Sequence, residues 1–363
     1  MDKGLDIDGR RRLLACHAVL GSLAADAAGR SPAGAAPAAA LAAALAHVRA
    51  TRRRPDFDAA ARALAWAAES PARRILVLGD ADYPPRLAAI ARPPLVLFVE
   101  GRMELLGSDQ VAIVGSRKAT SHGLRIASEF AGDLAAAGLT VTSGLALGID
   151  AAAHEGALAV AGATLAVVGC GIDRVYPARH RRLAGAIRST GAIVSEFALG
   201  TPPARRHFPQ RNRLIAGLSL GTLVVEAAAR SGSLSTAFHA LEQGREVFAV
   251  PGSIRNPQAQ GCHILIKQGA KLTERVEDVL EELPGGHTRA PPTAPVSRDH
   301  APGDALDPAA ARVLEACGWH PTSLEEIVGR CGLTLPDVSS ILLQLELAGR
   351  VDFRTNGTYM RTR

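Results

Sequence analysis

The fold is decided by residues 111–148, VAIVGSRKATSHGLRIASEFAGDLAAAGLTVTSGLALG. The apolar run Val111–Val114 predicts a strand, the segment at about 121–137 predicts a helix, and Thr140–Ser143 predicts a second strand. Short strands without polar alternation, joined by an amphipathic helix, are typical of parallel strands that are buried on both faces. This stretch therefore predicts one strand–helix–strand unit of a parallel sheet.

The same alternation continues on both sides of this unit. Further strands are predicted at Thr164–Val168, Ile193–Ser195, Thr222–Val225 and Val247–Val250, and further helices at about 150–161, 179–189, 233–243 and 261–268. An earlier pair, Ile75–Leu78 and Leu95–Val99, is expected to add edge strands or a bridging layer. Strands that alternate with helices in this way indicate an α/β protein with a doubly wound, mostly parallel sheet.

The regions that flank this sheet differ from it in composition. Residues 1–70 are typical of a helical N-terminal domain, which precedes a core over 71–283. Residues 284–305 include five prolines and show no periodicity, which predicts a linker. The remainder, 306–363, is predicted to form a separate small domain.

This last domain has the pattern of a winged helix. Three short helices are expected, followed by two strands around Asn356-Gly357, a good hairpin signal. Three helices with a small hairpin are the winged-helix variant of helix-turn-helix. The expected helices are Pro308–Ala316, Ser323–Val328 and Pro336–Leu347, and the expected strands are Val351–Phe353 and Thr358–Met360.

Composition excludes several classes of protein. The 41 basic and 35 acidic residues give a net charge of +6, which is too mild to identify a polyanionic partner. Five scattered cysteines without a CxxC pair argue against a disulfide framework and a zinc ribbon. The N-terminus lacks the layout of a signal peptide, and the longest Ala-rich run, Ala38–Ala46, is too short to span a bilayer. We therefore expect a cytoplasmic protein without a metal site or a membrane partner.

Four strand ends are followed by glycine-rich turns, and ligands of open α/β sheets bind outside such carboxyl ends. Glycine lets the backbone approach an anion, and N–H groups at helix starts attract negative charge. Ser116 and Arg117 add a hydroxyl and a guanidinium that suit phosphate oxygens. Alternatively, these glycines only form the turns of the fold. The turns are Gly115-Ser116-Arg117, Gly144 to Gly148, Gly169-Cys170-Gly171 and Ser231-Gly232-Ser233.

Known nucleotide motifs do not accompany these turns. Neither GxGxxG nor GxxxxGK[ST] occurs in the sequence, so classical dinucleotide binding and ATP hydrolysis are poorly supported. No cofactor is expected.

The strongest local signal is the stretch from Arg174 to Arg213, which holds nine arginines and one acid, Glu196. The segment 205–213, RRHFPQRNR, is predicted to be a loop by its prolines. An arginine-rich loop with an embedded ring, Phe208, suits single-stranded nucleic acid, because cations follow the phosphates and a base stacks on the ring. Phe208 could equally fill the core. The arginines at 179, 181 and 182 could simply form a solvated helix face.

Candidate catalytic groups are few. Asp150 and His154 lie one helical turn apart and could act as an acid–base pair, or each could have a packing role. Glu226 follows a strand and could act on a nucleotide ribose, or it could accept hydrogen bonds from nearby backbone N–H groups. No catalytic residue is assigned.

Several motifs, in order, are similar to those of DNA-processing protein A, the DprA or Smf family. The resemblance covers about 75–283, and the tail from Val313 to Arg361 resembles the winged helix that many members carry. The N-terminal segment departs from the family, because the glycines of its helix-hairpin-helix domain are not evident. The matching motifs are VAIVGSR (111–117), SGLALGID (143–150) with His154, GCGID (169–173) with Tyr176-Pro177, FPQRNRLIAGLS (208–219), VEA (225–227), SGS (231–233) and VPG (250–252).

The resemblance implies a function and a set of site residues. It implies an extended Rossmann-like core that binds single-stranded DNA, forms a homodimer, protects incoming DNA and loads a RecA-type recombinase in natural transformation. The implied DNA-binding residues are Gly115, Ser116, Arg117, Arg205, Phe208 as the stacking ring, Arg211, Asn212 and Arg213. The implied dimer contacts are Ile264, Leu265 and Leu272.

Two other functions stay open on the sequence. Residues 221–226 resemble part of a motif of phosphoribohydrolases, which would make the protein a nucleotide-processing enzyme. The winged helix could bind duplex DNA, but its expected recognition helix carries Asp337 and Glu346 and neither Arg nor Lys, which favours a contact with protein.

Overall fold

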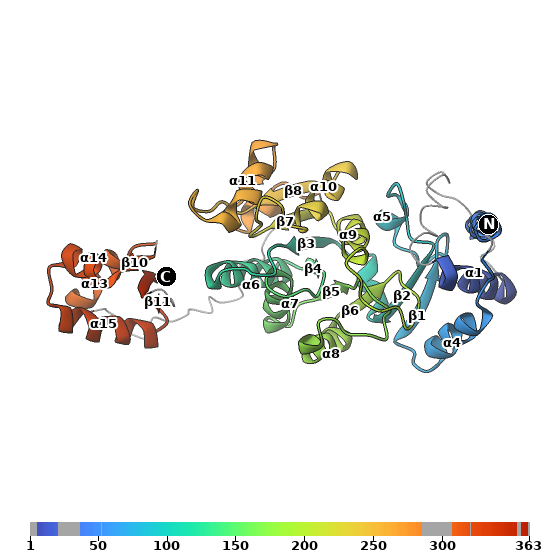
Figure 1. Ribbon diagram of the computed structural model, residues 1–363, viewed down its shortest axis with the longest axis horizontal. Coiled ribbons are helices and arrows are strands. Elements are labelled where there is room, and N and C mark those ends of the chain that lie inside the picture. The colour runs from blue at the N-terminus through green and yellow to red at the C-terminus, as the bar shows by residue number, and fades with distance from the viewer. Residues whose placement is uncertain are drawn as a thin grey trace. The chain divides into compact units, whose positions relative to one another are not determined.

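The computed structural model describes residues 6–20, 37–51, 53–284, 307–319, 321–353 and 357–361 (Figure 1). The chain divides into two compact units, Met1–Ala290 and Pro291–Arg363. The linker predicted over 284–305 lies outside the described residues except for Pro284. None of the helices in the described ranges combines the length and the hydropathy that a membrane span needs.

The first unit is built on a sheet in which nine strands are described. The strand order is β1-β2-β6-β5-β4-β3-β7-β8-β9, parallel from β6 to β9, with β2 and β1 added antiparallel at one edge. The predicted α/β class and the predicted edge pair are therefore confirmed. The strands are β1 (Arg73–Val77), β2 (Val96–Gly101), β3 (Gln110–Val114), β4 (Thr140–Ser143), β5 (Thr164–Val167), β6 (Ala192–Ser195), β7 (Gly221–Val224), β8 (Glu246–Ala249) and β9 (Lys271–Leu272).

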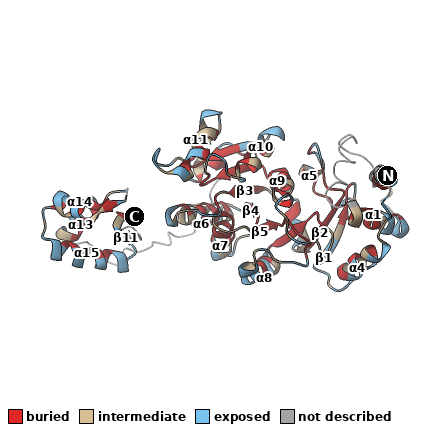
Figure 2. Cartoon of the chain, viewed as in Figure 1, coloured by how far each residue is buried: buried red, intermediate tan, exposed pale blue. Residues whose placement is uncertain are grey.

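The unbroken apolar character of β3 follows from burial on both of its faces. Ala112 and Val114 belong to one hydrophobic cluster, while Val111 and Ile113 belong to another. Because successive side chains of a strand point to opposite faces, these two clusters lie on the two sides of the sheet. Figure 2 shows the central strands as buried along their length.

The helices that follow the strands cover the two faces of this sheet (Figure 1). Their bounds agree with the predicted segments within a few residues, apart from α9, which was not expected. They are α6 (Ser121–Ala136), α7 (Ile149–Ala159), α8 (Arg181–Thr190), α9 (His207–Leu218), α10 (Leu234–Glu242) and α11 (Gln260–Lys267), with the shorter α5 (Pro85–Ala88) and α12 (Glu277–Leu280) and the 3₁₀ turns η1 (Met103–Leu106), η2 (Ala178–His180) and η3 (Pro257–Ala259).

Helix α9 overturns the prediction of a loop over 205–213. Its only proline, Pro209, is the third residue of the helix. A proline is tolerated in the first turn, because the N–H group that it lacks would have no partner within the helix. The arginines of this segment are therefore fixed to a rigid element.

Three N-terminal helices, α1 (Ile7–Leu20), α3 (Pro37–Ala50) and α4 (Phe57–Ala68), belong to the same unit as the sheet. Leu13 of α1 and Trp66 of α4 are part of the hydrophobic cluster that contains Phe98 of β2. His17 of α1 is buried, and its Nε2 lies 2.7 Å from the carbonyl oxygen of Glu196. These helices extend the core over the antiparallel edge of the sheet.

Where the chain changes direction across the sheet, it leaves a switch point. The path runs from β3 outward through β4 and β5 to β6, and later returns to place β7 on the other side of β3. Ligand crevices of doubly wound sheets form outside the carboxyl ends of the strands at such a point. The loops after β3 and β7 are therefore where a site is expected.

The second unit has the arrangement of a winged helix. Its three-stranded sheet has the order β10-β12-β11, and Phe353 pairs with Tyr359 across the hairpin. The three predicted helices and the pairing of the two hairpin strands are confirmed, whereas the two-residue β10 was not anticipated, and Asn356 of the predicted turn lies outside the described residues. The elements are α13 (Pro308–Cys317), β10 (Thr322–Ser323), α14 (Leu324–Cys331), α15 (Leu335–Leu347), β11 (Val351–Phe353) and β12 (Thr358–Arg361).

Candidate nucleic-acid interface

A pocket of about 790 Å³ opens at the switch point of the sheet. Its wall is formed by the loop after β3, the loop after β7, the first half of α9 with Arg205 ahead of it, and Tyr176 from the segment before α8. Segments that are more than one hundred residues apart in sequence thus meet in one place, as the parallel topology requires. The lining residues that carry the argument are Gly115, Ser116, Arg117, Lys118, Asp150, Tyr176, Arg205, Phe208, Arg211, Asn212, Arg230 and Gly232.

Four cations at this pocket are exposed to solvent. Within the described residues, none of them has an ion pair or a hydrogen bond through its side chain. The only acidic side chain of the lining is Asp150, which is buried. The pocket therefore presents a surplus of positive charge, which suits a polyanion. The four cations are Arg117, Lys118, Arg205 and Arg230.

The aromatic side chain of Phe208 lies in the pocket wall and not in the core. The guanidinium carbon of Arg117 lies 4.8 Å from the centre of the Phe208 ring, close enough for a cation–π contact. The ring of Tyr176 lies 5.7 Å from that of Phe208, at an interplanar angle of 39°. The structure thus brings the predicted residues Arg117, Arg205 and Phe208 to one pocket.

The loop after β3 is fixed by backbone contacts. The Ser116 N–H donates to the carbonyl oxygen of Glu226 at 2.6 Å, and the Ser116 carbonyl accepts from the Ile149 N–H at 3.2 Å. Gly148 packs against this loop with a φ of 79°, and a Cβ on it would lie 2.2 Å from the Ser116 oxygen. These contacts aim the side chains of Arg117 and Lys118 from a rigid turn.

Glu226 holds Thr120, the N-cap residue of helix α6, which follows this loop. Its carboxylate accepts hydrogen bonds from the Thr120 N–H at 2.8 Å and from the Thr120 hydroxyl at 2.7 Å. The Thr120 hydroxyl in turn accepts from the Gly123 N–H at 3.0 Å. The start of α6 thus already holds a carboxylate of the protein itself, which makes this helix start less favourable for a phosphate than the sequence pattern suggests.

Of the two interpretations of Glu226, the one based on backbone hydrogen bonds is confirmed. Both carboxylate oxygens of Glu226 accept hydrogen bonds from Thr120. The hypothesis of a nucleotide-processing enzyme, in which Glu226 acts on a ribose, therefore loses the support of this residue.

Arg211 is predicted to contact DNA, but its side chain is buried. The guanidinium donates to the Gly144 oxygen at 2.7 Å and also to the Val167 oxygen. Burial lowers the pKa of Arg211 to about 10, while the nearby Asp150 opposes this shift. A side chain on Gly144 would collide with the guanidinium, so glycine is required there. Arg211 therefore attaches α9 to the carboxyl ends of β4 and β5.

Asn212 and Arg213 are engaged in the same manner. Asn212 donates to the Ser235 hydroxyl at 2.7 Å and to the Gly232 oxygen at 3.2 Å, which attaches α9 to the start of α10. Arg213 is buried, forms an ion pair with Glu196 and does not line the pocket. The expectation that Arg213 meets DNA is thus contradicted by its position, because its guanidinium faces a buried carboxylate.

Asp150 and His154 do not form an acid–base pair. Asp150 accepts from the Gly144 N–H at 3.1 Å and from the Ala146 N–H at 3.3 Å, and burial raises its pKa. His154 is fully buried beside the Thr164 hydroxyl at 2.7 Å, and burial lowers its pKa to about 3. Each residue therefore has a separate packing role, which was the alternative interpretation.

The expected dimer contacts are divided between the core and the surface. Leu265 is fully buried in the hydrophobic core of its own unit and cannot meet a partner, so that expectation is wrong. Ile264 is half-buried, and Leu272 on the edge strand β9 is 44% exposed. These two positions remain available to a second copy.

Basic side chains are few among the described residues of the winged-helix unit, and three of its four described arginines contact groups of their own unit. Arg312 donates to the Cys331 oxygen, Arg330 donates to the Ala316 oxygen at 3.2 Å, and Arg361 lies over the Trp319 ring at 4.7 Å. Helix α15 exposes leucines and two acids instead of basic residues. Groove binding usually needs cations that pair with phosphates, so the duplex-binding alternative is disfavoured.

Lys118, Arg230 and Tyr176 were not assigned to the site from sequence. Lys118 and Arg230 each stand beside a glycine-rich turn, so their proximity to two strand ends at the switch point could have identified them. Tyr176 lies in the arginine-rich stretch, but its pocket position depends on a long loop whose path the sequence pattern does not give.

The fold and the pocket define a Rossmann-like protein with a cationic and aromatic cleft at its switch point and a separate winged-helix unit. A family model described as DNA recombination-mediator protein A matches residues 74–284, and one described as DprA winged helix domain matches residues 292–354. The chain therefore belongs to the family of DNA-processing proteins known as DprA or Smf.

Individual relatives agree with this assignment. Protein Smf from Escherichia coli (strain K12) is 46% identical over 303 residues, which cover 83% of this chain and 80% of that protein. A solved structure of DNA processing protein A from Streptococcus pneumoniae matches with a TM-score of 0.61 and 34% identity, covering 77% of this chain and 99% of that one. DNA processing protein A from Helicobacter pylori, solved to describe its single-stranded DNA binding mode, matches with a TM-score of 0.52 and 28% identity, covering 57% and 94%.

Proposed function

We propose that this protein binds single-stranded DNA in the pocket at the switch point of its sheet. The observation that carries the proposal is the meeting of four unpaired cations with the rings of Phe208 and Tyr176 in one pocket. Cations that track a backbone, combined with rings on which bases stack, are the general means of binding unpaired strands. The H. pylori relative, whose structure describes single-stranded DNA binding, supports the same assignment.

The bound strand is then delivered to a RecA-type recombinase and protected on the way, in recombination that includes natural transformation. This step is supported by the description of the family as a recombination mediator. Dimerisation through the edge near β9 would place two such pockets on one particle, and the exposed Leu272 supports this arrangement. Sedimentation of the wild type and of Leu272→Arg tests the dimer, which should dissociate in the variant.

A titration of single-stranded against double-stranded oligonucleotides at two salt concentrations tests the binding proposal. If the four pocket cations each neutralise one phosphate, log K falls with log salt at a slope of roughly −3, because each contact on a single strand contributes about −0.7. Arg117→Ala and Arg205→Glu should weaken single-strand binding severely with the fold intact. Equal affinity for both forms of DNA, or unchanged affinity in both variants, would contradict the proposal.

A further inference from the structure

Tyr176 is the most exposed aromatic side chain of the pocket. Tyr176 is 46% exposed, whereas Phe208 is half-buried. No ion pair or hydrogen bond involves the Tyr176 hydroxyl within the described residues, which leaves this hydroxyl to solvent. The Tyr176 ring contacts the Phe208 ring at 5.7 Å between centroids, and much of its remaining surface is open to solvent.

The segment that carries this ring is held firmly in place. The Gly171 N–H donates to the Thr201 oxygen at 3.0 Å, and the Gly200 N–H donates to the Asp173 carboxylate at 2.9 Å. The Arg174 N–H also donates to the Gly171 oxygen at 2.9 Å. Tyr176 therefore projects from a preorganised loop, which reduces the entropy lost when a ligand orders it.

The ring of Phe208 is already in contact with protein groups. The Arg117 guanidinium lies over it at 4.8 Å, and the Tyr176 ring lies beside it at 5.7 Å. A base can reach the covered face only after Arg117 has moved away. In the free protein, the aromatic surface that is open to a base therefore belongs mainly to Tyr176.

We propose that Tyr176 is a second base-stacking side chain of the single-stranded DNA site, and that it receives a base before Arg117 leaves Phe208 for a phosphate. The proposal rests on the proposed function. Two exposed arginines, Arg174 and Arg179, flank Tyr176 in sequence and have no ion pair within the described residues. Neither arginine lines the pocket, but their closeness to Tyr176 in sequence offers positive charge to a strand that continues past the ring.

The proposal differs from a purely structural role of Tyr176. A tyrosine that merely supported Phe208 would affect binding through the position of that ring, whatever its own contact with DNA. A stacking tyrosine loses its contribution when the strand carries no bases, while the phosphate contacts remain. The comparison of a strand with bases and one without them therefore separates base stacking from phosphate contact, and Tyr176→Ala made in a Phe208→Ala background separates the two roles, because a tyrosine that only supports Phe208 has no effect there and a stacking tyrosine keeps its effect.

The experiment uses the full chain and thymidine oligomers of about 16 nucleotides, within the range of single-strand footprints. A second strand of equal length has abasic sites throughout. Tyr176→Ala should bind the thymidine strand about five- to thirtyfold more weakly than the wild type, the lower part of the range for one stacked base. Tyr176→Phe should retain binding, because it keeps the ring. On the abasic strand, Tyr176→Ala and the wild type should agree within about twofold.

Phe57→Ala is the matched control, since Phe57 is 43% exposed on α4 and lies outside the pocket. It should leave the affinity for both strands unchanged. The proposal is overturned if Tyr176→Ala binds the thymidine strand as tightly as the wild type, or if it loses the same factor on both strands. If the wild type itself shows no preference for single strands, the proposed function fails instead, so the two failures are distinguishable.

Discussion

Replacing Arg211 by Met separates its fastening role from a direct contact with DNA. The substitution removes two hydrogen bonds from a buried guanidinium to the Gly144 and Val167 carbonyl oxygens. Hydrogen bonds that involve a charged group contribute about 1.5–3 kcal/mol each, and the desolvation of the buried guanidinium offsets part of this sum. We therefore expect the free energy of unfolding to fall by about 3 kcal/mol, which lowers Tm by about 6–12 °C.

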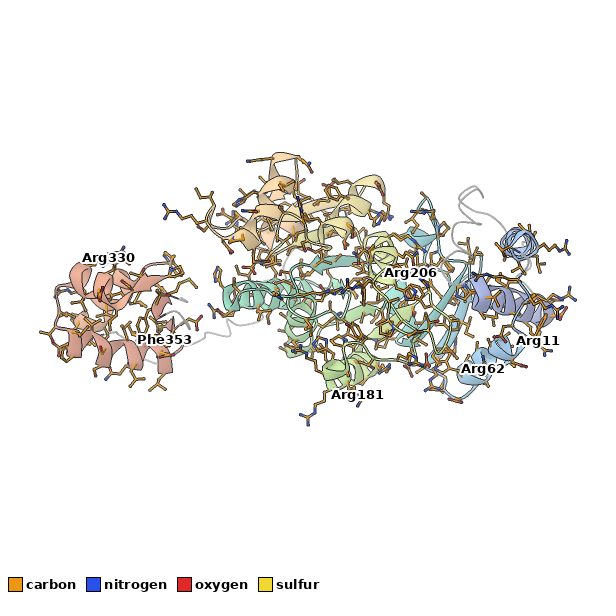
Figure 3. The ribbon with its side chains drawn as sticks, in the orientation of Figure 1. Arg11, Arg62, Arg181, Arg206, Arg330 and Phe353 are labelled. Carbon is orange, nitrogen blue, oxygen red and sulfur yellow. The ribbon has the colours of Figure 1, made fainter. Side chains whose placement is uncertain are left out.

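Thermal and urea unfolding of the full chain measure this change. The matched control is Arg181→Met, because Arg181 is exposed on α8 and extends away from the sheet (Figure 3). That substitution should alter the free energy of unfolding by less than about 0.5 kcal/mol. Well below its Tm, Arg211→Met should keep most of its affinity for single-stranded DNA. The reasoning is refuted if Arg211→Met is as stable as the wild type and yet loses affinity as severely as Arg205→Glu.

Other predictions concern the pocket, the cap of α6, the N-terminal helices and the winged helix. Arg205→Ala should make the salt dependence of log K shallower by about 0.7, measured by titration between low and moderate salt. Glu226→Gln should destabilise the fold by about 1 kcal/mol through the weakened cap at Thr120, without changing DNA affinity. Burial lowers the pKa of His17 to about 4, so the unfolded chain binds more protons between about pH 6.5 and 4. The free energy of unfolding should therefore decrease as the pH is lowered through this window, by about 3 kcal/mol at pH 4. His17→Gln should flatten this part of the plot of unfolding free energy, measured with urea, against pH. Deleting residues 304–363 should leave single-strand affinity within about twofold, because the pocket lies wholly in the other unit.

The sheet could be predicted from sequence because its strands are buried on both faces. A strand such as β3 has no solvent-facing side, so the apolar run Val111–Val114 marks it without ambiguity. Helix α9 could not be predicted in this way, because a proline such as Pro209 is typical of a loop as well as of the first turn of a helix. Whether a proline ends a helix or lies in its first turn depends on where the helix starts, which local composition does not decide.

Charge patterning indicated a segment that does line the pocket, but not the state of each arginine. Arg205 and Arg211 are alike in sequence, yet one is exposed and the other is buried. The partners of Arg211 are the carbonyl oxygens of Gly144 and Val167, which come from distant strand ends. Because these partners are backbone atoms, no residue type in the sequence indicates them.

The residues of α9 and of the turn just before it divide between the pocket and the core. Arg205 and Phe208 lie at its start and face the pocket, while Arg211, Asn212 and Arg213 anchor the next turn to β4, β5, α10 and Glu196. Anchors from several directions leave the first turn little freedom to move, so Phe208 is held in place before DNA arrives. A preorganised ring loses less entropy on binding than one on a mobile loop. The burial of two arginines predicted to contact DNA, Arg211 and Arg213, is thus compatible with the proposed site, because both hold in place the residues that we propose to meet DNA.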